Sequence, residues 1–382
     1  MIIRKGYKYQ MKIDTETEQK LTQHTGSCRY FWNKILADNE HRYISNTPRI
    51  SFADACKLVT LWRESDEYSF LADVHSQALQ QALRDLDRAY INCFEGRAEP
   101  PNFRKKFLDD TFRFPQGYQV DGSRVYLPKI GWVWLWKSRD IAGTIKNVTV
   151  SRRVEHWYVT FQTEIDIEAP LHLSEAAVGI DMGVVCFATL SDGQLTQPLD
   201  SFRKYEERLA KEQRQLSIKV KFSNNWIKQK RVVNQIHQKI ANCRHDFLHK
   251  HSTTISKNHA IIVVEDLQVS NMTRSAKGTV EAPGKNVAQK SGLNKAILDQ
   301  GWGMFHTFLE YKQVWRGGEV IAVAPPYTSQ KGAECGHVSP ENRPSQAVFS
   351  CVACGHTDHA DVNAARNILA AGLVERLNAC GS

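Results

Sequence analysis

The sequence predicts a multidomain protein with a small β-barrel, a helical domain inserted into that barrel, and a larger mixed α/β domain. The chain has 382 residues, more than the roughly 250–300 at which one hydrophobic core stops growing. One strand-like segment precedes a long stretch with apolar residues at helical spacing, and short aromatic and β-branched segments follow. In the last half of the chain, buried strand patterns alternate with helical ones, which is typical of a covered α/β sheet.

Composition narrows the class of protein. A hydrophobic content of 42% and an aromatic content of 10% indicate a folded chain. No segment approaches the roughly 18 apolar residues of a membrane span, and the first residues lack the apolar centre of a signal peptide. We therefore expect a cytoplasmic protein with no membrane partner. The formal charge of +9 and the pI near 9.0 favour a polyanionic partner, but they leave the oligomeric state unknown.

The helical domain is predicted for residues 14–97. A loosely alternating strand covers residues 6–13, and Asp14 or Thr15 can cap the helix that follows. Two sets of apolar residues recur every three or four positions and mark two helices. The first set is Leu21, Cys28, Phe31, Trp32, Ile35 and Leu36, and the second is Leu79, Leu83, Leu86, Tyr90 and Phe94.

The β-barrel is predicted for residues 1–13 and 98–172. Pro100 and Pro101 end the helical pattern, and short strand-like segments separated by Gly, Asp and Pro follow. These segments are residues 125–127, 132–136, 145–150 and 157–163. Since the opening strand can join the same sheet, the helical domain is interpreted as an insertion.

The α/β domain is predicted for residues 173–382. Its expected strands are 176–180, ending at Asp181, then 185–190 with a hairpin turn at 191–193, then 260–264, ending at Glu265, and 319–323. The expected helices are a charged stretch at 201–257, a helix at 293–316, and a last helix that Asp361 opens. The Ser-, Gly- and Lys-rich residues 271–291 are expected to be mobile and are a candidate lid.

Three carboxylates carry the predicted chemistry. Asp181 and Glu265 each follow a buried strand, and Asp361 begins the last helix. Taken singly, such residues are more often turn formers or helix caps. Taken together, after this order of strands and helices, they indicate a ribonuclease-H-like nuclease core. Carboxylate oxygens are the ligands that Mg²⁺ prefers, and two Mg²⁺ ions about 3.5–4 Å apart can cleave a phosphodiester.

Several motifs resemble the TnpB/OrfB family of transposon proteins, in order along nearly the full chain. The three that carry the carboxylates are Val178–Gly183, Val263–Leu267 and Asp361–Ile368, which resemble the RuvC motifs of that family. Further similar segments are Gly301–Gly303, Leu309–Lys312, Tyr327–Gln330, Leu127–Gly131 and Asn102–Lys106.

The resemblance implies an RNA-guided endodeoxyribonuclease, related to type V CRISPR effectors. It implies a RuvC-like domain, a wedge domain for the β-barrel, and a recognition domain for the helical insertion. Asp181, Glu265 and Asp361 would be the Mg²⁺ ligands, and the partners would be a guide RNA from the element's end and a double-stranded DNA target beside a short flanking motif. Two alternatives stay open: an RNA-guided DNA-binding repressor without efficient cleavage, and a strand-transferring transposase.

A cysteine cluster near Asp361 predicts a zinc site that lacks one ligand. Cys351 and Cys354 have zinc-knuckle spacing, and Cys335 precedes a glycine as in a second knuckle. In the family that second pair reads Cys-x-x-Cys, whereas Gly332 stands at its first position here. His337, or alternatively water, Glu334, His356 or His359, can complete the set; loss of the metal is the other interpretation. We describe residues 328–357 as a degenerate zinc ribbon.

The remaining cysteines are scattered, as buried small hydrophobic residues usually are. They are Cys28, Cys56, Cys93, Cys186, Cys243 and Cys380. An odd total of nine, with no secretion signal, argues against a disulfide framework.

Basic residues predict where nucleic acid binds. Residues 219–231 contain basic residues and no acid, which favours contact with phosphates. The commoner explanation of a charge run is an ordinary solvated helix face. The candidates for phosphate contact are Lys219, Lys221, Lys228, Lys230, Arg231, Arg104, Lys105 and Lys106. Gln77 and Gln80 can present amides to an adenine edge, although exposed helix polar residues are commoner.

Overall fold

The computed structural model describes residues 1–106, 110–279, 281–324 and 327–380. The chain divides into two compact units, residues 1–168 and 169–382. Within the described residues, no helix combines the length and the apolar character that a membrane span requires.

The first unit is built on a seven-stranded antiparallel sheet with the order β2-β6-β7-β1-β5-β4-β3. Its strands are β1 (Ile2–Lys12), β2 (Thr111–Phe114), β3 (Gln119–Asp121), β4 (Arg124–Leu127), β5 (Gly131–Trp136), β6 (Thr144–Arg153) and β7 (His156–Asp166). The opening strand does join the later strands, because β1 lies between β7 and β5. The predicted antiparallel pairing of these distant segments is confirmed, but the edge strands β2 and β3 are not paired with each other, so the described residues form a half-barrel and not the closed barrel that was predicted.

Three α-helices and a short 3₁₀ helix lie between β1 and β2 in the chain. They are α1 (Thr15–Ile44), α2 (Phe52–Glu64), η1 (Asp66–Leu71) and α3 (Ser76–Phe94). Asp14 caps α1 as expected, because its Oδ1 accepts a 2.7 Å hydrogen bond from the Thr17 amide. The apolar spacing predicted α1 and α3 but not α2, which buries only Ala55 and Val59.

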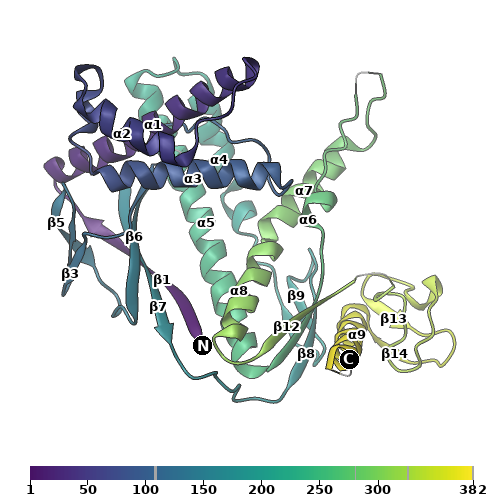
Figure 1. The fold of residues 1–382 in the computed structure, drawn as a ribbon. Coiled ribbons are helices and arrows are strands. Elements are labelled where there is room, and N and C mark those ends of the chain that lie inside the picture. The colour runs from purple at the N-terminus through teal and green to yellow at the C-terminus, as the bar shows by residue number, and fades with distance from the viewer. Residues whose placement is uncertain (107–109, 280, 325–326, 381–382) are drawn as a thin grey trace. The chain divides into compact units, whose positions relative to one another are not determined.

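The helices and the sheet of the first unit share one hydrophobic core. Leu21, Phe31 and Leu79 of the helices belong to the same buried cluster as Phe114 and Phe161 of the sheet. Figure 1 shows α1, α2 and α3 gathered at one end of the strands. The helical insertion therefore has no separate core of its own.

The second unit contains a five-stranded mixed sheet with the order β10-β9-β8-β11-β12. Its strands are β8 (Ala177–Asp181), β9 (Ala188–Leu190), β10 (Leu195–Thr196), β11 (Ile261–Glu265) and β12 (Glu319–Val323). β8, β11 and β12 are parallel, and β9 is antiparallel to β8. The predicted mixed α/β unit is confirmed. The second strand is shorter than the predicted 185–190, because the Gly183 amide turns back to bond the Cys186 carbonyl.

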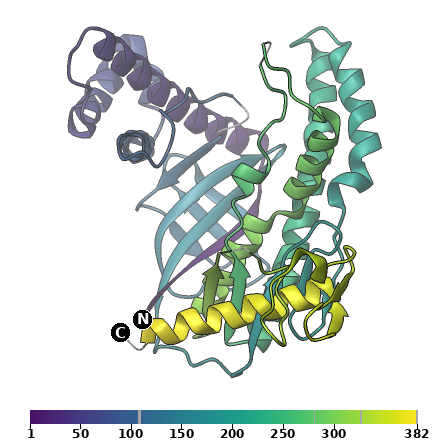
Figure 2. The ribbon, with the colours of Figure 1, turned by 90° about the vertical axis from the view of Figure 1, so that its right-hand side faces the viewer.

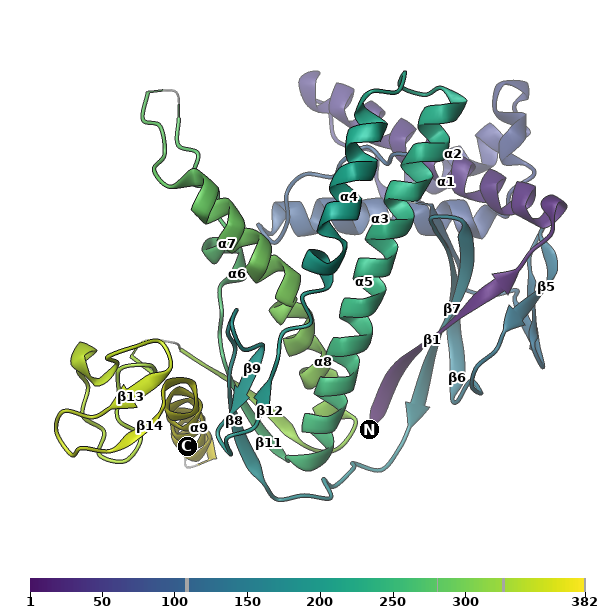
Figure 3. The same ribbon diagram turned by 180° about the vertical axis from the view of Figure 1, so that it is seen from behind.

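The helices of the second unit are α4 (Ser201–Ser217), α5 (Asn224–Asn258), α6 (Val269–Met272), α7 (Val287–Gln300), α8 (Trp302–Val314) and α9 (Ala360–Cys380). Two stretches were each predicted as one helix, and each forms two helices in the structure. The stretch 201–257 breaks before Ser223, whose side chain caps α5 at the Trp226 amide, and α4 and α5 form a helical hairpin (Figure 3). The helix predicted at 293–316 breaks at Gly301, whose φ is +73°.

The candidate lid at 271–291 is only partly regular. It contains the end of α6, an isolated bridge between Gly278 and Pro283, and the first turn of α7. Residue 280 lies outside the described residues. The mobility expected for this segment stays a prediction.

Helices cover both faces of the mixed sheet. Side chains of α5 and α8, such as Leu248 and Phe305, pack with Val178 and Ile180 on one face. On the other face α9 lies across the strands (Figure 2), where Ile368 packs on Val263. Gly179 makes this contact possible, because a Cβ there would lie 2.1 Å from the Ala365 carbonyl oxygen of α9.

We expect Gly179→Ala to destabilise the second unit by at least about 2 kcal/mol, since overpacking a core usually costs about 1–3 kcal/mol and here the obstacle is backbone. Gly292→Ala on α7 is the matched control, because its added methyl group would meet no atom within 4 Å. Denaturant unfolding of the full chain measures both. Equal stabilities of the two variants would contradict the close contact between α9 and β8.

Candidate active site and nucleic-acid interface

The ends of two adjacent parallel strands place Asp181 and Glu265 on the same face of the sheet. Gly179 pairs with Val263, and alternate residues of a strand point to the same face. Asp181 is two residues beyond Gly179, and Glu265 is two residues beyond Val263. Since Gly179 and Val263 face α9, both carboxylates are directed toward the side that α9 covers.

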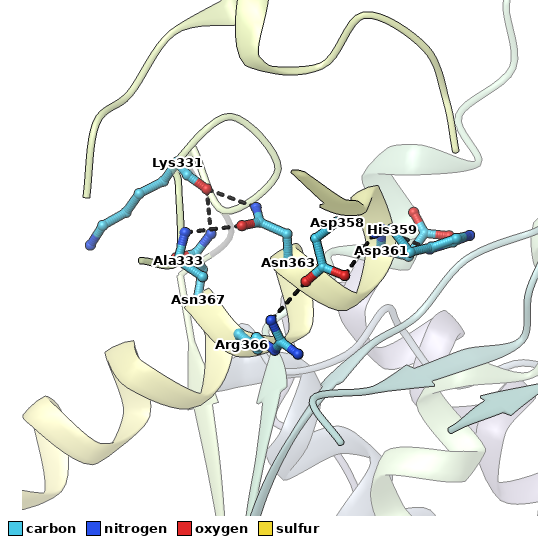
Figure 4. A network of polar contacts seen from close by, with 8 residues as sticks. All are labelled: Lys331, Ala333, Asp358, His359, Asp361, Asn363, Arg366 and Asn367. Carbon is cyan, nitrogen blue, oxygen red and sulfur yellow. Dashed lines mark hydrogen bonds and ion pairs between the residues drawn. The ribbon is translucent and has the colours of Figure 1, made fainter. Parts of the chain in front are cut away.

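Asp361 comes to this edge from the first turn of α9. The guanidinium of Arg343 contacts its carboxylate at 3.2 Å. The neighbouring Asp358 is turned toward Arg366 instead, with an ion pair of 2.8 Å (Figure 4). The structure therefore brings the three predicted carboxylates to one edge of the sheet and holds Asp358 apart from them by its own partner.

The other two carboxylates affect the electrostatics of Asp181. Burial, then the charges of Glu265 and Asp361, raise the pKa of Asp181 to about 7, while Arg343 acts in the opposite direction. Burial also raises the pKa of Glu265, although its Oε1 accepts a 2.7 Å hydrogen bond from Thr328. Negative charge is therefore costly at this edge, as expected where like charges gather in a partly desolvated place.

A divalent cation fits this set of donors. Three carboxylates from β8, β11 and α9 supply only oxygen ligands, which suit Mg²⁺ and not the soft metals. A cation would also offset the charge repulsion that raises the pKa of Asp181. The carboxylates are not tightly clustered: across the described ranges, the only three Cys, His, Asp or Glu side chains with ligand atoms all within 4.8 Å of one another are Cys335, Cys351 and Cys354.

Two asparagines of α9 hold the start of the first knuckle and the residues before it in place (Figure 4). Asn363, which is fully buried, accepts from the Ala333 amide at 2.9 Å and donates to the Lys331 carbonyl at 2.8 Å. Asn367 donates to the same carbonyl and to that of Thr328. Because Thr328 also bonds Glu265, these contacts connect α9 to the carboxylate on β11.

The three clustered cysteines come together as predicted. The Sγ atoms of Cys335 and Cys351 are 3.4 Å apart, and Cys354 is within 4.8 Å of both. Hydrogen bonds from the Cys354 and Ala353 amides help to lower the pKa of Cys351 to about 7. Such N–H groups favour the thiolate, which is the form that binds metal.

The backbone at Gly332 forms the same hydrogen-bonded turn as the backbone at Cys351. The Gly332 amide donates a hydrogen bond to the His337 carbonyl, and the Gly336 amide donates one to the Gly332 carbonyl. The second knuckle repeats this pattern between Cys351, Gly355 and His356. A Cβ at Gly332 would lie 3.3 Å from the Cys335 sulfur and 3.5 Å from that of Cys351, so this is the position from which a fourth ligand would reach the site.

The histidine alternative for that ligand is not supported by the geometry. His337 is exposed and is not part of the close cysteine group.

Of the scattered cysteines, Cys28 and Cys186 are buried as expected, but Cys56 and Cys93 are half-buried and Cys243 is exposed. The prediction was wrong for Cys243 because it lies on the outer side of α5. The side chain of Cys380 lies outside the described residues.

Most of the predicted basic cluster lies at the tip of the α4–α5 hairpin. Lys219 and Lys221 are in its turn, and Lys228, Lys230 and Arg231 are in the first turns of α5. Aromatic side chains accompany them: Lys221 lies 5.4 Å from the ring of the exposed Phe222, and Lys230 lies 4.8 Å from that of the half-buried Trp226.

The second basic group lies against the helices of the first unit. The Arg104 guanidinium stacks 3.7 Å from the Trp32 ring, while Lys105 and Lys106 are exposed. Arg104 also lines a cavity of about 220 Å³ with Gln81 and Arg113. The predicted amides Gln77 and Gln80 do not line this cavity. Gln81, one residue further along α3, is the amide that does.

Sequence reasoning missed two residues beside the carboxylates. Thr328 lies in a motif that matched the family, but nothing in its type indicated a bond to Glu265. Arg343 carried no signal, because it contacts Asp361 across 18 residues of chain. Both come from the segment between β12 and α9.

Fold and site together define a mixed α/β protein with a carboxylate-centred site and an adjoining cysteine site. Three family models match the chain: "Probable transposase" over residues 159–276, "Cas12f1-like, TNB domain" over 302–368, and "Helix-turn-helix domain" over 1–47. In this structure residues 1–47 form a strand and one long helix.

Two relatives match almost end to end. One, named "Putative RNA-guided DNA endonuclease InsQ", is from Escherichia coli K12 and is 49% identical over 98% of this chain and 94% of its own. Another, from Streptomyces pristinaespiralis, is named "Putative RNA-guided DNA endonuclease" and is 33% identical over 99% of this chain and 91% of its own. The chain belongs to the TnpB/OrfB family.

A solved structure has the same fold. It is the cryo-EM structure of a Cas12f1–sgRNA–target DNA complex, with a TM-score of 0.58 and 13% identity, covering 96% of this chain and 98% of that one.

We expect the metal-free protein to lose stability as the pH rises from about 4 to about 7. Across this window folded Asp181, with its pKa raised from 3.8 to about 7, binds more protons than the unfolded chain does, so the free energy of unfolding decreases with pH. Asp181→Asn removes the contribution of Asp181 to this dependence, leaving that of Glu265, and should unfold about 5 °C above wild type at pH 8 in EDTA.

Thermal unfolding from pH 5 to pH 8 in EDTA measures the effect. Glu175→Gln is the control, since Glu175 is exposed just before β8. A wild type and an Asp181→Asn variant that lose stability in parallel would contradict the assigned cause.

Proposed function

We propose that this chain is a transposon-encoded, RNA-guided, metal-dependent DNA endonuclease. It binds a guide RNA from the element's end and cleaves DNA beside a short flanking motif. The observation that carries the proposal is the meeting of Asp181, Glu265 and Asp361 at one edge of the mixed sheet, in a chain whose end-to-end relatives are named as RNA-guided DNA endonucleases.

The three carboxylates are the catalytic residues in this proposal. Asp181 and Glu265 on rigid neighbouring strands, and Asp361 on α9, would hold two Mg²⁺ ions. When bound, such ions would supply Lewis-acid chemistry, namely activation of a water molecule and stabilisation of charge on the leaving oxygen of the phosphodiester. Thr328 orients Glu265 through its 2.7 Å hydrogen bond, and Arg343 balances part of the charge on Asp361.

We assign nucleic-acid roles to the remaining parts by the same family membership. The β-barrel (1–13 and 98–172) acts as a wedge domain and the helices (14–97) as a recognition domain. Residues 173–382 are the RuvC-like nuclease domain. The lysines at the α4–α5 tip contact phosphates of the guide or of the RNA–DNA duplex, where each neutralised phosphate releases counterions. Base pairing with the guide then reads most of the target sequence.

We further propose that Cys335, Cys351 and Cys354 hold a zinc ion with a fourth position left to solvent. Structural zinc sites normally have four protein ligands, and the position of the fourth is that of Gly332. The close thiols and the intact knuckle turns support zinc, and the absent ligand predicts weaker binding than in a four-cysteine site.

Cleavage with the copurified RNA tests the proposed function. RNA that copurifies with the protein is sequenced, and a plasmid library carries its target beside randomised flanking bases. Wild-type protein should cut a defined subset in Mg²⁺ and none in EDTA. Asp181→Ala and Glu265→Ala should each lose at least about 100-fold in rate, as removal of groups that stabilise a transition state does.

Asp266→Asn is the matched control, because this exposed acid adjoins Glu265 and its carboxylate accepts hydrogen bonds from the Gln268 amide. Wild type that cuts no better than Asp181→Ala, yet still binds the target, would favour the repressor alternative. Joining of a labelled element end to target DNA would favour the transposase alternative. Recovery of no discrete RNA would contradict RNA guidance.

Gly332→Cys should strengthen zinc binding by at least about tenfold, because zinc sites are sensitive to each group that completes or supports them. The new sulfur would extend from a Cβ already 3.3–3.5 Å from two others. Competition with a chromophoric chelator measures the affinity in the full-length protein. Gly332→Ser is the control of similar size, and equal affinities of the two variants would argue against a fourth thiolate at this position.

A further inference from the structure

Three tryptophans of β5 form an exposed face that the proposed catalytic machinery does not use. Trp132, Trp134 and Trp136 are 46%, 57% and 65% exposed. Val133 and Leu135 between them are buried in the core, so the three indole rings share the outer face of the sheet. Tryptophan is highly buried on average in folded proteins. A row of three exposed rings therefore indicates a surface that binds something.

Cationic and aromatic side chains of β4 adjoin the tryptophans. Arg124 pairs with Trp134 in the register, and Tyr126 pairs with Trp132. The guanidinium of Arg124 lies 5.3 Å from the ring centre of Trp132 and 5.5 Å from that of Trp134. The Tyr126 and Trp132 rings are 5.7 Å apart. Contacts of this kind orient the rings while leaving them open to solvent.

The strand on the other side adds positive charge. Lys12 of β1 pairs with Trp134 in the register and is exposed. Lys8 is on the same face, with its ammonium 4.4 Å from the Tyr158 ring of β7. Asp121, opposite Arg124 in the register, is paired with it, and Asp140 just after β5 is paired with Lys137. The face therefore combines open aromatic rings with cations, which is complementary to bases and phosphates.

We propose that this β5 face binds unpaired nucleotides of the guide RNA, with bases stacked on the tryptophans and phosphates on Lys8, Lys12 and Arg124. The proposal rests on the proposed function for the identity of its RNA. Successive rings on one face of a strand are about 6.6 Å apart, whereas stacked bases of a duplex strand rise by only about 3.4 Å. Only bases splayed apart can each meet a ring, as in single-stranded nucleic-acid platforms.

Binding of two RNA probes to full-length protein tests the proposal. The probes are a labelled ten-nucleotide oligouridylate and a blunt RNA duplex of equal length, measured by fluorescence anisotropy at one salt concentration. In Trp134→Ala/Trp136→Ala, the affinity for the single strand should fall at least tenfold, and the affinity for the duplex should be unchanged. The magnitude follows from stacking of about 1–3 kcal/mol per base. Quenching of wild-type tryptophan fluorescence by the single strand should decrease in the variant.

Two further variants exclude trivial causes. Tyr43→Ala removes another exposed aromatic side chain of the same unit, 86% exposed at the end of α1, and should bind as wild type does. Trp134→Phe/Trp136→Phe keeps rings that stack and should recover most of the affinity.

Several results would overturn the proposal. The proposal is overturned if Trp134→Ala/Trp136→Ala binds the single strand as tightly as wild type does. It is also overturned if the variant loses affinity equally for both probes, which would indicate a general effect of charge or folding. Wild-type self-association that the double variant loses in sedimentation would identify the face as an interface between copies. Failure of guided cleavage is a separate result: it contradicts the proposed function, while tryptophan-dependent binding of the single strand would still support the face.

Discussion

The close contact of α9 with β8 determines the geometry of the proposed active site. The backbone of α9 passes so near Gly179 that no side chain fits between them, and Gly372 of α9 lies equally close to Val263. These two contacts fix the helix over the parallel strands at two points. Asp361, at the start of that helix, is then positioned by the core and not by the charges around it. A rigid scaffold of this kind is what allows three like charges to be held together at all.

The negative charge at this edge of the sheet is partly offset by side chains from the segment between β12 and α9. Burial of Asp181 and Glu265 is unfavourable for their ionised forms, and Thr328 and Arg343 offset part of the cost. Both residues come from the stretch between β12 and α9 that also contains the knuckles. Asn363 and Asn367 hold the same stretch on α9. The carboxylates and the cysteine site are therefore joined through one hydrogen-bonded network, and a disturbance of the knuckles can reach Glu265 through Thr328.

Local patterns predicted the parts of the fold that local sequence determines. The strands before Asp181 and Glu265 are apolar runs that end at an acidic residue, and the structure reproduces them within a residue. The long helices were predicted in place but not their breaks, because the positive charge of residues 219–231 continues through the turn before Ser223. Arg343 and the pairing of β1 with β7 depend on contacts between distant residues, which no local pattern records.

The same distinction explains how the first knuckle retains its turn without its first cysteine. The turn is held by the amide of Gly332 on the His337 carbonyl and by Asn342, a fully buried side chain. Asn342 donates to the carbonyls of Gln330 and His337 and accepts from the Val352 amide of the second knuckle. None of these bonds involves a thiolate. Since the backbone does not depend on a ligand at position 332, the framework that carries Thr328 and Arg343 to the carboxylates does not depend on the affinity of the proposed zinc site.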